Sequence, residues 1–221
     1  MKKQILVLGA VLIMGVTGCG SQKASETETS KETVQQSSSV EETTSEVTTA
    51  EEYVKRENTN FRNAYWGDDI ETVKKYEEEK LEGNGTEKGL LYSTKVGNYS
   101  ANAMYFFDND GKLYQGMYGI NEEFTNAGQY IPLFQSLRDS LKEKYGEPDE
   151  DTILRLANQS QIDFAGDAKA LEYGYVVYRA TWNNYNGTEI MIGMQAQNYK
   201  VQIVIGYTDV NYKEDVNNSG L

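Results

Sequence analysis

The stretch TEIMIGMQAQNYKVQIVIGY, residues 188–207, decides how this chain folds. Its apolar residues alternate with other residues in two blocks, a period of two that is typical of β-strands with one buried face. The first block, residues 188–196, aligns Ile190, Ile192 and Met194. The second, residues 199–207, aligns Val201, Ile203, Ile205 and Tyr207. Because Gln197-Asn198 separates the blocks, the pattern predicts two antiparallel strands joined by a tight turn.

Four more strand-like runs precede this pair, at residues 90–96, 101–107, 113–120 and 173–182. Gly97-Asn98 and the run from Asp108 to Gly111 separate the first three of them. Asn, Asp and Gly tolerate the positive φ that tight hairpins require, so these three runs predict one antiparallel meander. The run 173–182 leads through residues 183–187 into the 188–207 pair and predicts a second meander.

Two helices are expected, one before each meander. The apolar residues of the second recur at intervals of three and four, which predicts a helix from Pro132 to Tyr145 that Gly146 and Pro148 end. The first should begin after Trp66-Gly67 with Asp68 or Asp69 as its cap, and run to Gly83-Asn84-Gly85. Its apolar stripe is Ile70, Val73, Tyr76 (or Glu77) and Leu81.

The resulting order is α-βββ-α-βββ, which predicts an α+β fold of antiparallel strands with helices packed on one face. The order also raises the hypothesis of a duplicated αβββ unit. Residues 147–169 are ambiguous: 152–157 fit either a strand or a short helix, and the remainder resembles a loop.

The N-terminus has the layout of an export signal. Lys2 and Lys3 precede an apolar run from Ile5 to Val16, which is shorter than the roughly 20 residues that a membrane span needs. We therefore expect residues 1–18 to be a signal peptide. Val16-Thr17-Gly18-Cys19 resembles a bacterial lipobox, which implies that Cys19 carries a lipid anchor. Two acyl chains hold a protein stably at a membrane, so the expected location is the extracytoplasmic face of the cell membrane.

Residues 19–50 read as a tether and 51–221 as a single domain. The tether is rich in Ser, Thr and Glu and has no aromatic residue, so it cannot bury enough apolar surface to fold. The length of the second segment suits one domain. The net charge of the chain, −13, argues against nucleic acid as a partner.

Several short signatures resemble a group of small uncharacterised bacterial lipoproteins of the Gram-positive type. They are the run FRNAYWG at 61–67 followed by Val73, the run LKEKYGEP at 141–148, and Trp182 followed by the strand with Ile190. The tandem helix-and-sheet order is more distantly similar to β-lactamase-inhibitor-protein-like domains. These resemblances imply an anchored α+β domain, and the second implies protein binding rather than catalysis.

The chain lacks the side chains of the common nucleophile–base pairs. It contains no histidine, and Cys19 is its only cysteine, so no Ser-His or Cys-His pair can form. No cofactor and no metal is expected. Asp108-x-Asp110-Gly111 is similar to the start of a calcium loop, but position twelve is Gly119 rather than an acid, which favours a simple hairpin turn.

Carboxylates leave one enzyme hypothesis open, a carboxylate-dependent hydrolase of cell-wall glycan. The two acidic runs, 77–79 and 149–151, fit solvated surface better, because the first is expected to fan around a helix and the second to lie in a loop. A hydrolase requires a cleft with two facing acids.

The 17 tyrosines are the most unusual feature of the composition. Tyrosine and tryptophan combine large contact areas with a polar tip, so they are common on recognition surfaces. The candidate recognition surface consists of Tyr173, Tyr175, Trp182, Tyr185 and Tyr199. The alternative is that most tyrosines pack half-buried on the sheet. The leading hypothesis is a non-catalytic binding or scaffolding lipoprotein whose partner is an envelope protein or a wall glycan.

Overall fold

A computed structural model describes residues 55–83 and 85–212. All of them belong to one compact unit, Ala50–Leu221. The predictions for residues 1–18, for Cys19 and for the tether 19–50 lie outside the described residues.

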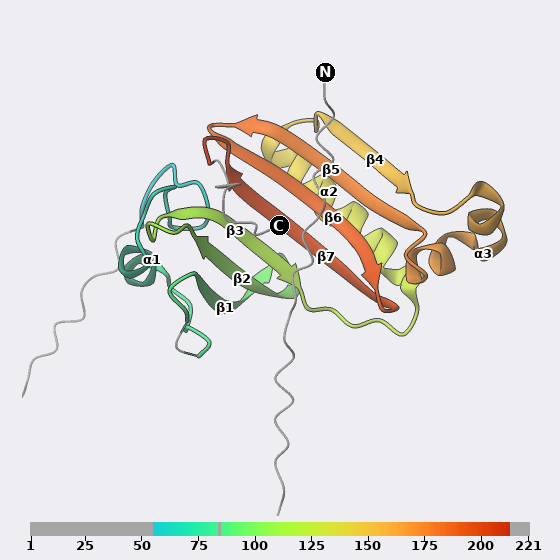
Figure 1. Ribbon diagram of the computed structural model, residues 1–221, viewed down its shortest axis with the longest axis horizontal. Helices are drawn as coiled ribbons and strands as arrows, with labels where there is room; N and C mark the ends of the chain where they lie inside the picture. The colour runs from blue at the N-terminus through green and yellow to red at the C-terminus, as the bar shows by residue number, and fades with distance from the viewer. Residues whose placement is uncertain (1–54, 84, 213–221) are drawn as a thin grey trace, which may run out of the picture. The chain divides into compact units, whose positions relative to one another are not determined.

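The fold is α+β, as the sequence predicts. Residues 55–83 and 85–212 form three α-helices and one antiparallel sheet of seven strands in the order β1-β2-β3-β7-β6-β5-β4 (Figure 1). The strands are β1 (Gly89–Val96), β2 (Tyr99–Phe107), β3 (Leu113–Ile120), β4 (Glu150–Arg155), β5 (Val176–Tyr185), β6 (Thr188–Gln197) and β7 (Lys200–Asp209). The helices are α1 (Ile70–Tyr76), α2 (Tyr130–Tyr145) and α3 (Gln159–Glu172), with a 3-10 turn η1 (Ala127–Gln129) before α2.

The stretch 188–207 forms the predicted hairpin. Ile192 pairs with Ile205 and Met194 with Ile203, and all four side chains are buried. The turn lies at Asn198 and Tyr199, which both adopt positive φ. This hairpin is central because β7 also pairs with β3, so the two meanders join through their last strands.

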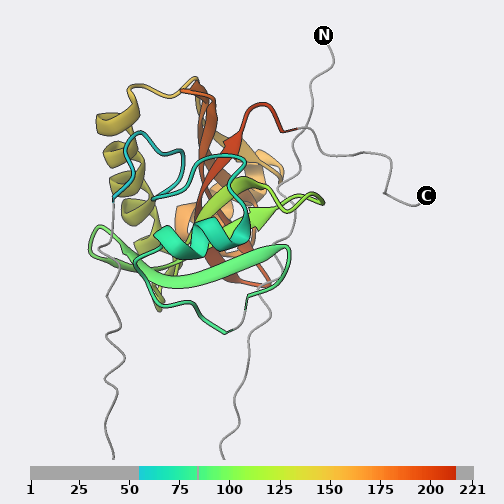
Figure 2. The same cartoon turned by 90° about the vertical axis from the view of Figure 1, so that its left-hand side faces the viewer.

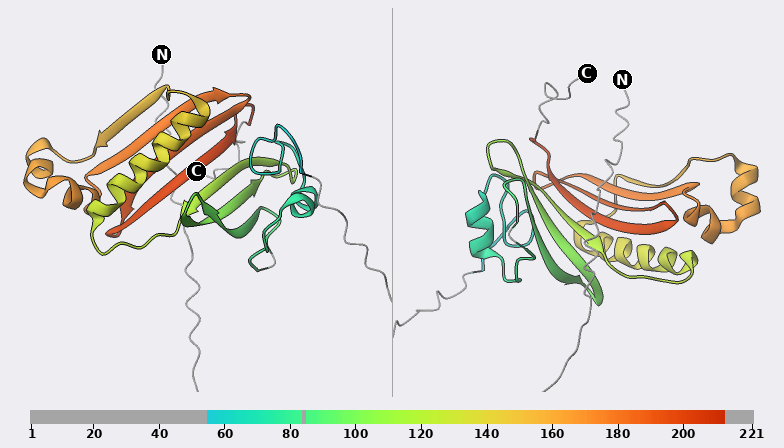
Figure 3. Two further views of the ribbon diagram at one scale, coloured as in Figure 1. Left: turned by 180° about the vertical axis from the view of Figure 1, so that it is seen from behind. Right: turned by 60° about the horizontal axis from the view of Figure 1, so that its bottom comes forward.

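One face of the sheet carries the core. A row of paired residues crosses it: Tyr105, Gly116, Tyr207, Ile190 and Trp182. Helix α2 lies on this face across β5, β6 and β7 (Figure 3), and its Phe134 contacts Tyr178 of β5. The segment that precedes α1 covers the β3 side of the same face, where Phe61 packs on Tyr105 and Tyr118.

Helix α2 and the two hairpins of the first meander are as expected. Asp108 accepts backbone hydrogen bonds from Asp110 and Lys112, and Gly111 has φ 71°, so this run forms the predicted turn. Gly97 has φ 60° in the other hairpin.

The prediction for α1 was right at its start and wrong at its end. Asp69 caps the helix by accepting from the backbone N of Thr72 at 2.8 Å. The helix ends at Tyr76 rather than near Gly83, and Glu77 is extended. The reason is tertiary: the Glu77 carboxylate binds Arg62, and Leu81 pairs with Tyr92 beside β1.

The ambiguous region 147–169 contains an edge strand, which was one of the two alternatives for residues 152–157, and a helix that the apolar pattern does not reveal. Residues 150–155 form β4, which pairs with β5. The expectation of a loop after residue 157 is wrong, because α3 begins at Gln159 with a capping box made by Asn158 and Gln161. Gly166, at φ 70° and ψ 165°, interrupts the helix and with it the apolar period.

Candidate functional site

A polar, aromatic pocket of about 360 Å³ lies on the covered face of the sheet. It opens between the segment before α1 and the C-terminal end of α2, two elements that Figure 2 shows on the same side of the sheet. Its lining residues are Asn58, Thr59, Asn60, Phe61, Arg62, Tyr118, Lys144, Tyr145, Tyr185, Asn186, Thr188, Ile190 and Tyr207. A volume of this size suits a small ligand.

The floor of the pocket depends on a glycine. Phe61 lies on Gly116 of β3, and a Cβ at Gly116 would stand 2.1 Å from Cδ1 of Phe61. The missing side chain allows the ring to enter the row between Tyr105 and Tyr207, with centroids 5.1 and 5.3 Å away. Phe61 therefore holds the N-terminal segment against the sheet at the pocket.

Behind the floor, Arg62 forms a buried ion pair. Its Nε and one Nη donate to the Glu77 carboxylate at 2.8 and 2.7 Å, and its other Nη donates to Thr94 Oγ1 at 2.9 Å. The hydroxyl of Tyr105 also donates to Glu77. Burial lowers the pKa of Arg62, but the hydrogen bonds and charge of Glu77 outweigh it, so the pKa of Arg62 is raised. The guanidinium is thus a fixed positive charge that is already neutralised.

Two tyrosine hydroxyls lie deep in the pocket. Burial raises the pKa of Tyr207, and the hydroxyl of Tyr145 approaches it at 3.5 Å. Burial also raises the pKa of Tyr118, although the charge of Arg62 opposes it. Both hydroxyls therefore stay protonated at neutral pH and can donate a hydrogen bond to a ligand.

The rim is aromatic and cationic. Tyr145 and Tyr185 meet edge to face with centroids 4.9 Å apart, and Nζ of Lys144 lies 4.8 Å from the centroid of Tyr145. Tyr185 is 40% exposed. On the other side, Oγ1 of the buried Thr188 accepts from Asn60 at 3.3 Å and from Trp66 at 3.0 Å. These contacts fix the β5–β6 turn against the N-terminal segment.

The lining can bind but offers little for acid–base catalysis. It presents tyrosine and threonine hydroxyls, asparagine amides and the amine of Lys144, and no carboxylate is among the described residues that line it. Glu77, which binds the lining residue Arg62, has a side chain that is only 1% exposed. Within residues 55–83 and 85–212, no three His, Cys, Asp or Glu side chains cluster as they would to hold a metal ion.

The candidate recognition surface does not form one surface. Tyr185 lines the pocket at the C-terminal end of β5, whereas Tyr173 and Tyr175 precede the opposite end. The Tyr173 ring meets Tyr175 and Tyr199 at 5.6 and 6.1 Å, and these three line a second, more open hollow. Trp182 is 3% exposed and donates to the carbonyl of Gly146 at 2.8 Å, so it belongs to the core.

The sequence did not indicate most of the pocket. The sequence pattern places Tyr145 and Tyr207 on the apolar faces of a helix and a strand, and Tyr118 within a strand. No local pattern indicates that these three side chains meet. Neither Phe61 nor Gly116 alone indicates the pocket floor. Their contact depends on both residues, because the ring occupies the gap that the glycine leaves in the row.

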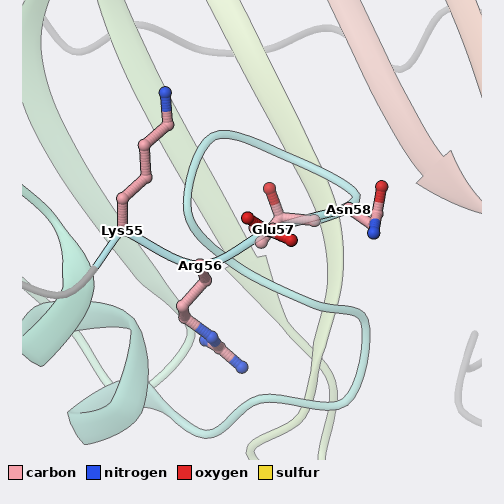
Figure 4. A pocket seen from close by; sticks show the side chains of 5 residues that line it. Lys55, Arg56, Glu57 and Asn58 are labelled. Carbon is pink, nitrogen blue, oxygen red and sulfur yellow. The ribbon is translucent and has the colours of Figure 1, made fainter.

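Another hollow lies along Lys55–Thr59 (Figure 4), and one continuous segment lines it. Lys55 and Arg56 point in opposite directions there. Arg56 is bound to Asp68 by contacts of 2.5 and 3.1 Å and lies 4.1 Å from the ring centroid of Tyr65. No set of side chains converges on this hollow, so the tyrosine-lined pocket is the better site.

Comparison with protein-family models, curated proteins and solved structures finds no match to this chain. Among the helices of the described residues, none has the length and apolar character of a membrane span.

Proposed function

We propose that this chain is a lipid-anchored protein of the extracytoplasmic membrane face that binds a polar ligand without catalysis. The observation that carries the proposal is the lining of the pocket by Tyr118, Tyr145, Tyr185 and Tyr207 without a carboxylate. Aromatic faces stack on ring-shaped ligands, while their hydroxyls hydrogen-bond to polar substituents. A sugar unit of a wall glycan has this chemistry.

The anchor makes this ligand class reachable. Cys19 follows an apolar run and small residues, and about 30 residues separate it from the domain, a flexible reach of roughly 30 Å. Cys19→Ser should release the chain from membranes or leave it unprocessed. Unchanged retention in the membrane fraction would refute the anchor and leave the ligand proposal standing.

Binding is tested by titrating soluble peptidoglycan fragments into the chain with Cys19→Ser and following the heat of binding. Tyr185→Ala should weaken binding at least about tenfold, which corresponds to about 1.4 kcal/mol. Tyr199→Ala is the matched control, since Tyr199 is an exposed tyrosine outside this pocket. If only Tyr199→Ala loses binding, the ligand binds in the hollow that Tyr173 lines instead.

The competing hydrolase hypothesis has a direct readout in the same samples. A carboxylate-dependent glycosidase would release reducing ends from the glycan. Turnover by the wild type that Glu77→Gln abolishes would overturn the non-catalytic proposal. Glu77 is the relevant residue because its carboxylate binds Arg62, which lines the pocket.

A further inference from the structure

The two edges of the sheet differ. At β1, the backbone N of Glu82 donates to the carbonyl of Leu91 at 2.9 Å, and Leu81 pairs with Tyr92, so this edge is partly covered. At the other edge, β4 has one neighbour in the described part of the chain, β5 (Figure 1). A strand edge with unpaired N–H and C=O groups is a template for another strand.

The register of β4 shows which backbone groups are unpaired. Arg155 is opposite Val176, and the backbone N of Leu156 donates to the carbonyl of Tyr175 at 2.8 Å. Hydrogen-bonded positions alternate along an antiparallel pair, so Thr152 and Leu154 direct their backbone groups toward β5. Asp151, Ile153 and Arg155 direct theirs outward.

The same three residues share the face of the sheet that α2 covers. Asp151 pairs with Ala180, a buried residue of that face, and its carboxylate accepts ion pairs from Arg138 and Lys142 of α2, both at 3.3 Å. Side chains alternate along a strand, so Ile153 and Arg155 are on this face too. None of the ion pairs among the described residues involves Arg155.

This edge is complementary to itself. When two copies of β4 run antiparallel about a two-fold axis at Ile153, each Ile153 faces the other. Asp151 then faces Arg155 of the second copy at both ends. All of these positions carry outward backbone groups, so the hydrogen-bond ladder continues across the axis. A two-fold axis perpendicular to the sheet keeps both α2 helices on one face, as the isologous geometry requires.

Exposed apolar side chains are frequent on β4 and in the segment that follows it. Half of the eight large apolar side chains that are exposed in the described residues fall within 153–164: Ile153 (42%), Leu154 (42%), Leu156 (67%) and Phe164 (95%). Between Asp151 and Arg155 the edge has no lysine, proline or bulge, which are among the devices that protect an edge strand.

We propose that this chain forms a two-fold homodimer through β4, with Ile153 on the axis and Asp151 paired with Arg155 of the second copy. The dimer carries two tyrosine-lined pockets on one assembly. A polymer with repeated units would then be bound by both pockets, which strengthens attachment through effective concentration. The dimer itself does not depend on the identity of that ligand.

Disulfide trapping tests the register. In the full chain with Cys19→Ser, Ile153→Cys introduces the only thiol. Opposed residues of a hydrogen-bonded antiparallel pair have Cα atoms about 5.5 Å apart, within disulfide range. Mild oxidation should therefore give a covalent dimer on a non-reducing gel. Leu156→Cys is the control, because residue 156 is more exposed than residue 153. In the proposed dimer the two residues 156 lie six positions apart along the strands, about 20 Å at 3.4 Å per residue.

Sedimentation equilibrium tests the charge pair without a cysteine. Arg155→Glu faces Asp151 with a like charge and should weaken the dimer at least about tenfold, whereas Arg155→Lys should retain it. A wild type that stays monomeric at about 100 μM would overturn the proposal, as would equal trapping of the two cysteine variants. A strand from another protein would then be the better occupant of the edge.

Discussion

Glu77 accepts two hydrogen bonds from Arg62, at 2.8 and 2.7 Å, and its carboxylate is almost completely buried. This pair connects the segment before α1 to the point where α1 ends. It also receives the hydroxyl of Tyr105 from the centre of the sheet. The pocket floor therefore rests on this ion pair. Among the described acids, the exposed Glu79 also lies near Arg62, at 4.0 Å.

Glu77→Ala should destabilise the domain by about 3–5 kcal/mol, because it leaves the guanidinium of Arg62 buried without its main partner. The free energy of unfolding in urea measures this loss. Glu78→Ala is the matched control, since Glu78 is exposed on the adjacent position, and we expect a change within about 0.5 kcal/mol. Equal effects of the two variants would show that the buried pair adds no stability.

Gly116→Ala should be destabilising through steric overlap. Its Cβ would stand 2.1 Å from Phe61, and a rigid ring in a packed floor cannot yield without moving the segment that carries it. We expect a loss of about 1–3 kcal/mol and weaker ligand binding at the pocket.

Gly119→Ala is the control for that substitution. Gly119 lies on the same strand, but the nearest atom to its Cβ is the flexible Cε of Met104 at 3.4 Å. Its effect on the unfolding free energy should be small, and binding should not change. If Gly116→Ala is as stable as Gly119→Ala, the ring of Phe61 does not occupy the gap in the row.

The sequence predicted the elements whose signal is local. Ile190 to Met194 and Ile203 to Tyr207 alternate with period two, and Phe134 to Tyr145 repeat with the helical period, so these elements formed where expected. The end of α1 could not be predicted in the same way. Glu77 leaves the helix to meet Arg62, a contact that depends on the tertiary fold.

The pocket was not predictable because its residues come from five separate segments. Tyr118 and Tyr207 approach only because β3 pairs with β7, and nothing in either strand specifies that pairing. The aromatic residues of the candidate recognition surface share a position on or beside strands, and that position does not distinguish the buried Trp182 from the exposed Tyr185.

Helix α3 did carry a readable signal, at its start rather than along its length. Asn158 Oδ1 accepts from the backbone N of Gln161 at 2.9 Å, and Gln161 Oε1 accepts from the backbone N of Asn158 at 3.3 Å. Asn158→Ala should therefore cost about 1 kcal/mol. Ser160 is the second residue of the helix, and Ser160→Ala should leave the stability unchanged or slightly higher. An unchanged unfolding midpoint in Asn158→Ala would mean that α3 does not need its cap.

Alkaline pH should unfold the domain through its buried tyrosines. Burial raises the pKa of Tyr92 to about 12, and it also raises the pKa of Tyr105, Tyr118 and Tyr207. The unfolded chain ionises near pH 10, so above that pH it releases protons that the folded chain retains. The stability from these neutral hydroxyls is complete below about pH 10 and falls as the pH rises. For Tyr92 this loss falls between about pH 10 and pH 12.

The contribution of Tyr92 can be isolated because burial and neighbouring charges, rather than a hydrogen bond, shift its pKa. Tyr92→Phe should keep the wild-type unfolding free energy at neutral pH and reduce its decline above pH 10 by up to about 1.4 kcal/mol per pH unit. Tyr199→Phe, which alters an exposed ring, should reproduce the wild-type decline. If Tyr92→Phe declines as steeply as Tyr199→Phe, then Tyr92 ionises as readily in the folded chain as in the unfolded one, and its burial does not keep it neutral.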